Sequence, residues 1–222
     1  LSRSVKWTAT RSESFLSDAQ GRDHVTDAYL AVDKEGKFLG VKVETTASVG
    51  AYLSQYGIFI PTLAAAGMHV GVYNIPVMVN NVKVVYTNTV PIDAYRGAGR
   101  PEASYVIERL VDQAARDMSL GQIEIRKLNY VQPSDLGNTE DPVIPFDSCD
   151  FDKTTNMTLL NSSFEDFEKR QKKSLDKNKL RGIGVSYYVE RTQGEGSENS
   201  RVVVSGDGSV KVYAGTMATG QG

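Results

Sequence analysis

Residues 93–103 read Asp-Ala-Tyr-Arg-Gly-Ala-Gly-Arg-Pro-Glu-Ala, which places an arginine in a glycine-containing turn directly before an expected helix. Gly97 and Gly99 can adopt positive φ and allow close approach to the backbone. Pro101 suits the first turn of a helix, where its missing N–H removes no hydrogen bond. Because the free amides and the positive end of the helix dipole then face the turn, the stretch favours an anionic ligand. Taken alone, it also fits an ordinary helix start that carries a surface arginine at Arg96.

The chain before this turn has the pattern of β-strands. Residues 25–32 and 39–46 alternate or are continuously apolar on both sides of a turn sequence at 33–37, which predicts a β-hairpin. An alanine-rich segment after Pro61 is expected to be a short helix. Residues 82–87 alternate as a strand that leads to the arginine turn.

Helices are expected after the turn. The first would carry on its apolar face Val106, Leu110, Val111, Ala114 and Met118, and on its other faces Glu108, Arg109, Asp112 and Arg116. A second is expected at 120–128, with Ser119 and Gln122 at capping-box spacing. Residues 132–155 contain three prolines and no sustained periodicity, which predicts an irregular connection.

The last quarter of the chain predicts a further helix and then β structure. Ser162 and Glu165 form a capping-box pair at the start of the helix. Residues 182–189, and the two runs on either side of the turn at 206–208, are expected to be strands. We therefore expect an α+β fold with a mixed sheet, in which residues 1–175 form part of a first domain with its linker. Residues 176–222 would begin a second, similar β-rich domain with exposed strand edges.

Composition excludes several classes of protein and site. The chain has 25 basic and 27 acidic residues and a net charge of −2, so it lacks the basic surface of a nucleic-acid-binding protein. No run of about 18 apolar residues exists that would span a membrane. The single cysteine, Cys149, excludes an internal disulfide and an iron–sulfur cluster held by this chain alone. Nearby aspartates are expected to raise the pKa of its thiol. His24 and His69 lack the spacing of a metal site, and no metal ligand is expected.

The sequence from residue 94 to residue 103 closely resembles the cofactor loop of molybdenum hydroxylase large subunits, the family of xanthine dehydrogenase, aldehyde oxidase and aerobic carbon monoxide dehydrogenase. Residues 5–13 are similar to the segment after the family's first glycine-rich cofactor loop, and residues 217–222 are similar to its later Gly-Gln-Gly loop. The resemblance covers essentially all 222 residues but only part of a typical large subunit, so the chain is expected to be a fragment.

The resemblance implies a molybdenum–pterin cofactor, with the cytosine dinucleotide form as one candidate. The residues implied to contact the cofactor are Tyr95, Arg96, Gly97, Ala98, Gly99, Gly220, Gln221 and Gly222. Ala98 and Glu190 are expected to line the substrate pocket. No catalytic residue is assigned, because the family's general-base glutamate is expected outside residues 1–222. The isolated chain is therefore expected to be inactive.

The implied activity is the hydroxylation or oxidation of an aldehyde, a heterocycle or a related small molecule, with water as the oxygen source. The implied partners are the remainder of the large subunit, an iron–sulfur small subunit with 2Fe–2S clusters and a flavin medium subunit with FAD, in the cytoplasm. Gly97 stands where copper-dependent members have a cysteine, and Ala98 stands where purine-hydroxylating members have an aromatic residue. The sequence is thus most similar to the carbon-monoxide-dehydrogenase-like group that lacks the copper cysteine. The alternative is a non-catalytic scaffold or relic of the same fold that binds partner subunits.

Overall fold

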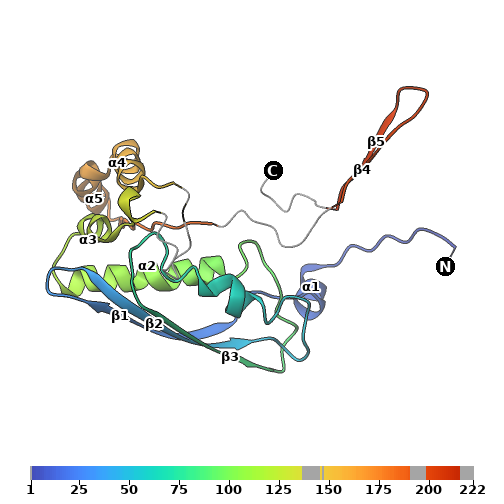
Figure 1. The fold of residues 1–222 in the computed structure, drawn as a ribbon, viewed down its shortest axis with the longest axis horizontal. Coiled ribbons are helices and arrows are strands. Elements are labelled where there is room, and N and C mark those ends of the chain that lie inside the picture. The colour runs from blue at the N-terminus through green and yellow to red at the C-terminus, as the bar shows by residue number, and fades with distance from the viewer. Residues whose placement is uncertain (1, 137–145, 147, 191–198, 216–222) are drawn as a thin grey trace. The chain divides into compact units, whose positions relative to one another are not determined.

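The computed structural model describes residues 2–136, 146, 148–190 and 199–215 (Figure 1). The contacts divide the chain into two units, residues 1–189 and residues 190–222, which we describe separately. The division into two domains at residue 175, which the sequence predicts, stays a prediction.

A three-stranded sheet in the order β1-β2-β3 forms the base of the first unit. The strands are β1 (His24–Val32), β2 (Phe38–Ser48) and β3 (Met78–Val85). β1 and β2 pair antiparallel, which confirms the predicted hairpin, and Gly36 in its turn has φ +93°. β3 pairs parallel to β2 and begins earlier than the predicted start at residue 82. The sheet is therefore mixed, as predicted.

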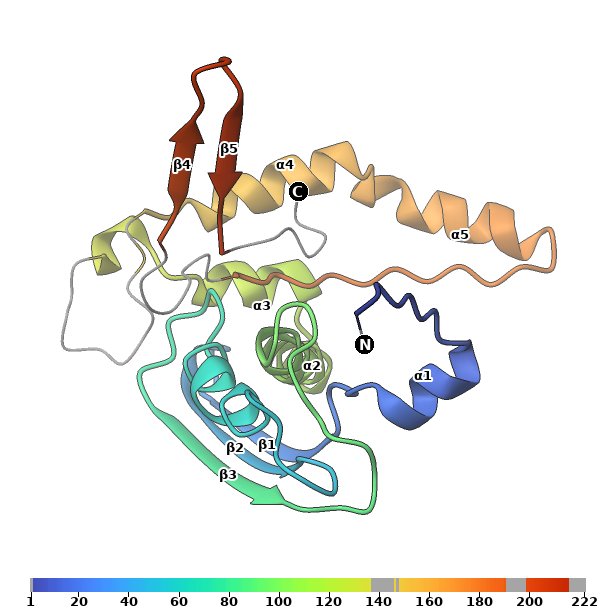
Figure 2. The same ribbon diagram turned by 90° about the vertical axis from the view of Figure 1, so that its right-hand side faces the viewer.

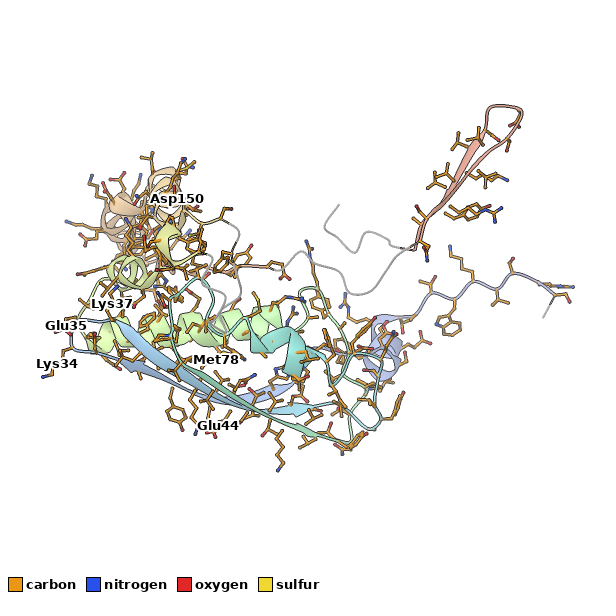
Figure 3. All side chains as sticks on the ribbon, in the orientation of Figure 1. Lys34, Glu35, Lys37, Glu44, Met78 and Asp150 are labelled. Atoms are coloured by element: carbon orange, nitrogen blue, oxygen red, sulfur yellow. The ribbon has the colours of Figure 1, made fainter. Side chains whose placement is uncertain are left out.

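One long helix covers one face of this sheet. α2 (Arg100–Asp117) lies along the sheet in Figure 1, and Figure 2 shows it end-on above the curved strands. Val43 of β2 and Ile107 and Val111 of α2 belong to the buried core between these elements. On the opposite face of the sheet, Figure 3 shows Glu44 pointing away from α2, and there Glu44 pairs with Lys42 at 3.0 Å.

The buried face of α2 differs from the predicted one. Its buried residues are Ala103, Ile107, Glu108, Val111 and Ala115, whereas Val106, Leu110 and Ala114 are half-buried. Glu108 was expected to face away from the core and is 6% exposed. It is tolerated there because the guanidinium of Arg126, from the next helix, pairs with its carboxylate.

The helix after α2 begins with a different cap from the predicted one. α3 (Gln122–Asn129) starts at Gly121, whose N–H donates to the carboxylate of Glu124 at 3.2 Å. The prediction of a capping box at Ser119 and Gln122 is wrong, because Ser119 lies in the turn that ends α2, with φ +57°.

Two predictions for the following segment are also wrong in detail. The connection is helical from residue 151, because the side chain of Asp150 accepts the N–H of Lys153 at 3.0 Å and caps α4 (Phe151–Asn161). Ser162 ends α4 and does not begin the next helix. The short η2 (Pro133–Asp135) precedes this region, and η3 (Phe164–Asp166) and α5 (Phe167–Leu175) follow it.

The remaining elements of the first unit are short. α1 (Arg11–Ser17) is capped by Thr10, and η1 (Ile60–Ala64) is a π-helical turn in the alanine-rich segment where a helix was expected. Residues 182–189 form no strand, and Figure 2 shows them as an extended run of the chain. Tyr187 in this segment packs with its ring centroid 5.5 Å from that of Tyr130.

The second unit contains one hairpin among its described residues. β4 (Arg201–Val204) and β5 (Val210–Tyr213) pair antiparallel, as the sequence predicts. Helices and a mixed sheet together confirm the α+β class. No helix among the described residues is both long and apolar enough to cross a membrane.

Candidate functional site

The arginine turn has an unusual backbone that only certain residues can adopt. Gly97, Ala98 and Gly99 have φ of +88°, +30° and +87°. A Cβ atom on Gly99 would lie 2.4 Å from the carbonyl oxygen of Ile60, so a side chain is excluded there by contact as well as by φ. Ala98 carries a side chain in a conformation that L-residues rarely adopt. The backbone of the turn is thus fixed by sequence and by close packing against η1.

Hydrogen bonds within the turn leave the amides of both glycines available. The N–H of Ala98 donates to the carbonyl of Tyr95 at 2.7 Å, and the N–H of Arg100 donates to the carbonyl of Gly97 at 3.1 Å. The N–H groups of Gly97 and Gly99 have no acceptor among the residues that the structure describes. Both lie directly before α2, whose dipole is positive at this end. The turn can therefore donate hydrogen bonds to a polar or anionic ligand.

Five of the residues predicted for the cofactor loop lie together on this turn. Tyr95 and Arg96 are exposed, Gly97 and Ala98 are half-buried and Gly99 is buried. Ala98 cannot offer its amide, because Tyr95 already accepts it.

The other predicted site residues are not brought to the turn by the described structure. Gly220, Gln221 and Gly222 lie outside the described residues, and their contacts with cofactor stay predictions. Glu190 is exposed and begins the second unit, so its place in a substrate pocket beside Ala98 also stays a prediction.

The segment before the turn is fixed by hydrogen bonds from two other parts of the chain. Asp93 donates its N–H to the carbonyl of Gln20 at 2.8 Å, and its carboxylate accepts the N–H of Tyr56 at 3.2 Å. The hydroxyl of Ser54 donates to the carbonyl of Ile92 at 2.6 Å. These bonds hold the chain at residues 92–93 before it enters the turn.

Arg22 is a residue of the site that the sequence did not reveal. Its guanidinium lies over the ring of Tyr95, 4.6 Å from the centroid, and donates to the carbonyl of Arg96 at 2.5 Å. Its Nε lies 3.6 Å from the carboxylate of Glu102 in the first turn of α2. Arg22 and Arg96 are 74 positions apart, and no motif links them. Only the pairing of the segment at residue 20 with the segment at residue 92 brings them together.

A cavity of about 510 Å³ borders the start of the turn. It is lined by residues of α1, by the segment between α1 and Arg22, and by Ala94 and Tyr95. Arg11 and Asp18 at its wall carry opposite charges, so the cavity has no single strong sign of charge. Its volume is in the range of small-molecule sites.

Burial favours the neutral form of both histidines. Burial lowers the pKa of His69 to about 4, and burial also lowers the pKa of His24 against the opposing charge of Glu102. Within the described part of the chain, no three histidine, cysteine or acidic side chains gather as a metal site. The pKa of Cys149 is raised, as predicted, by burial first and then by nearby aspartates.

Comparisons with known proteins agree on one family. Two family models, both described as "Molybdopterin cofactor-binding domain", match residues 1–130 and residues 158–222. The chain is 31% identical, over 98% of its length, to the 6-hydroxypseudooxynicotine dehydrogenase complex subunit gamma of Paenarthrobacter nicotinovorans, of which it covers 28%. It is also 31% identical, over 100% of its length, to the carbon monoxide dehydrogenase large chain of Hydrogenophaga pseudoflava, of which it covers 30%.

A comparison with solved structures shows that the fold is also similar. Quinoline 2-oxidoreductase from Pseudomonas putida 86 superposes with a TM-score of 0.83 at 27% identity, over 97% of this chain and 29% of that one. The chain thus spans less than a third of the length of these relatives. The first relative is, by its name, a subunit of a complex. With a family match over more than half of its residues, the chain belongs to the molybdopterin cofactor-binding domain family, that of molybdenum hydroxylase large subunits.

Proposed function

We propose that the turn at residues 95–99 forms part of the binding site of the molybdenum–pterin cofactor, with Arg96 and the amides of Gly97 and Gly99 as its donors. One observation carries the proposal: two amides at the positive end of α2 have no acceptor among the described residues. Consecutive left-handed residues make a concave turn that suits negative oxygen atoms. We identify the ligand as the molybdenum–pterin cofactor because the chain belongs to the molybdopterin cofactor-binding domain family.

The donor set fits such a cofactor. The cofactor is polyanionic and polar, and backbone amides and a guanidinium are the groups that bind phosphate and carbonyl oxygen in a fixed geometry. Gly97 adds no side chain that would cover the exposed edge of the turn, and Arg96 is exposed beside it. Tyr95 completes the turn by accepting the N–H of Ala98.

The whole protein, in this proposal, is the large subunit of an oxidoreductase that hydroxylates or oxidises an aldehyde, a heterocycle or a related small molecule. The bound cofactor supplies the two-electron oxidation, with water as the source of oxygen. This chain binds and orients the cofactor. A general-base glutamate, further cofactor contacts and the modules that carry FAD and 2Fe–2S clusters belong to the rest of the complex. The names of the relatives, a dehydrogenase complex subunit and a large chain, support this assembly.

The residues of the turn narrow the choice of substrate and metal. Gly97 has no thiolate to hold copper, so a molybdenum–copper centre at this position is not expected. Ala98 has no ring to stack on a purine. We therefore favour small aldehydes and heterocycles as substrates, to which Ala98 and Glu190 would be exposed.

Molybdenum analysis of the purified complex tests the proposal. The chain is purified from its native source with whatever co-purifies, as wild type, as Arg96→Ala and as Arg109→Ala. Arg109 is exposed on α2 outside the turn and serves as the matched control. Near-stoichiometric molybdenum that falls only in Arg96→Ala supports the proposal. Equal molybdenum in all three contradicts the role of Arg96. A well-folded wild type without molybdenum would favour a scaffold or relic.

A further inference from the structure

Arg22 has a backbone conformation that calls for an explanation. It lies two residues before β1 and has φ +63°, in the left-handed region that non-glycine residues rarely adopt. Such strained residues persist where the surroundings hold them in place, and they gather at functional sites. Here the surroundings that hold Arg22 are the residues of the arginine turn.

The guanidinium of Arg22 contacts two consecutive residues of the turn and one residue in the first turn of α2. It stacks on the ring of Tyr95 at 4.6 Å, donates to the carbonyl of Arg96 at 2.5 Å and lies 3.6 Å from the carboxylate of Glu102. The backbone beside it is equally close, since a Cβ atom on Gly21 would lie 3.0 Å from the Cβ of Tyr95. One side chain thus spans the residue before Arg96, Arg96 itself and the helix that follows.

The contact with Arg96 fixes the direction of one amide. In a trans peptide unit the C=O of one residue and the N–H of the next point in opposite directions. Because the carbonyl of Arg96 points at Arg22, the N–H of Gly97 points away from Arg22. That N–H has no acceptor among the described residues.

We infer that Arg22 is a positioning residue of the cofactor loop: it holds the peptide between Arg96 and Gly97 so that the Gly97 amide faces the cofactor. This inference rests on the proposed function of the turn. In this account Arg22 acts through the peptide and not by contact with the cofactor: one N–H of its guanidinium donates to the carbonyl of Arg96, and its Nε faces the carboxylate of Glu102. A planar guanidinium can stack on Tyr95 and donate in its own plane at the same time, whereas a lysine ammonium cannot.

The experiment uses the full-length large subunit in its complex, as wild type and with Arg22→Lys, Arg22→Gln or the control Arg109→Gln. Molybdenum and pterin are measured per large subunit. Residues that orient a ligand of a metal site contribute roughly 10- to 100-fold to affinity or activity, so both Arg22 variants should lose most of their molybdenum when the cofactor is limiting. Arg109→Gln should load like the wild type.

A spectroscopic signature separates positioning from a purely structural role. The electron paramagnetic resonance spectrum of the partly reduced complex reports the surroundings of molybdenum in the loaded fraction. A changed spectrum in Arg22→Lys, or complete loss of molybdenum from an assembled Arg22→Lys complex, supports the inference. An unchanged spectrum overturns it, whatever the loading. Arg22→Lys decides the matter if Arg22→Gln does not assemble, because lysine keeps the charge that faces Glu102.

The same preparations distinguish this inference from the function on which it rests. Full molybdenum loading in Arg96→Ala would contradict the proposed function of the turn. Reduced loading in Arg96→Ala, together with a wild-type spectrum and loading in Arg22→Lys, would contradict only the role of Arg22.

Discussion

The guanidinium of Arg126 on α3 and the carboxylate of Glu108 on α2 form a buried ion pair at 2.8 Å, with side chains that are 0% and 7% exposed. The hydroxyl of Tyr73 donates to the second oxygen of the same carboxylate. Arg126 also donates to Asp112 at 2.8 Å and to the carbonyl of Val185 at 2.8 Å. The network therefore joins the helix that begins at the arginine turn to α3 and to the extended segment at 182–189.

Replacing the buried Arg126 should lower the free energy of unfolding far more than replacing an exposed arginine. Arg126→Met leaves Glu108 buried without its partner, and breaking one side of a buried pair lowers the free energy of unfolding by about 3–5 kcal/mol. Arg116→Met, on the exposed side of α2, is the control and should cost less than about 1 kcal/mol. Urea unfolding of the three proteins measures both values. Equal, small losses would show that the network adds no stability.

The lowered pKa of His69 predicts that the fold loses stability in mild acid. Its pKa in the fold is about 4, below the ordinary 6.5, because burial disfavours the charged ring. Above pH 6.5 both folded and unfolded chains hold it neutral, and its contribution to stability is complete. As pH falls from 6.5 towards 4, only the unfolded chain binds the proton, so stability decreases, by about 3 kcal/mol in all. Unfolding by urea should show this slope in the wild type and a smaller one in His69→Gln. Identical slopes in the two proteins would contradict the assignment.

The sequence predicts those parts of the fold that depend on neighbouring residues. The hairpin of β1 and β2 follows from alternation around a glycine turn, and α2 follows from its apolar periodicity and from Pro101. The glycines at 97 and 99 identify the left-handed turn for the same reason, since their φ is a local property.

What the sequence does not reveal depends on partners far along the chain. A glutamate in an amphipathic helix is expected to face solvent, and Glu108 can be buried because Arg126 from another helix pairs with it and Tyr73 donates to it. Arg22 reaches the turn through a parallel bridge between Gln20 and Ile92, which leaves no periodic signal. The resemblance identifies Arg96, because Arg96 lies within a sequence motif. It does not identify Arg22, which lies outside the motif and contacts it.

Gly99→Ala should disturb the turn, although it adds only one methyl group. The new Cβ atom would lie 2.4 Å from the carbonyl oxygen of Ile60, at a φ of +87°. Strain of this kind costs about 1–3 kcal/mol where it is tolerated at all, and here η1 must also move. Gly182→Ala is the matched control, because nothing lies within 4 Å of its added Cβ atom. We expect a lower midpoint of unfolding and less molybdenum in the complex for Gly99→Ala alone. Two variants that behave alike would contradict the close packing of the turn on η1.

Asn129 offers a test in which the shape of the side chain is kept while its hydrogen-bonding groups and its charge change. Its buried amide donates to the carbonyls of Gly36 and Ile125, at 2.8 and 2.9 Å, and accepts the N–H of Phe38 at 2.8 Å. It thereby joins the hairpin turn to the end of α3.

Asn129→Asp keeps the shape of the side chain but turns a charged acceptor towards two carbonyl oxygens, so a loss of several kcal/mol is expected at neutral pH. A protonated carboxyl can donate once, so the pKa of the new group should be raised in the fold. Its destabilising effect should therefore shrink as the pH falls through that value. Asn81→Asp, on the exposed face of β3, should show neither effect. Urea unfolding at a series of pH values measures both variants. The loss in free energy of unfolding could instead stay constant as the carboxyl of Asn129→Asp protonates. That result would show that the two carbonyls relax away from the new side chain. It would also show that the amide of Asn129 does not determine how the hairpin turn and α3 are joined.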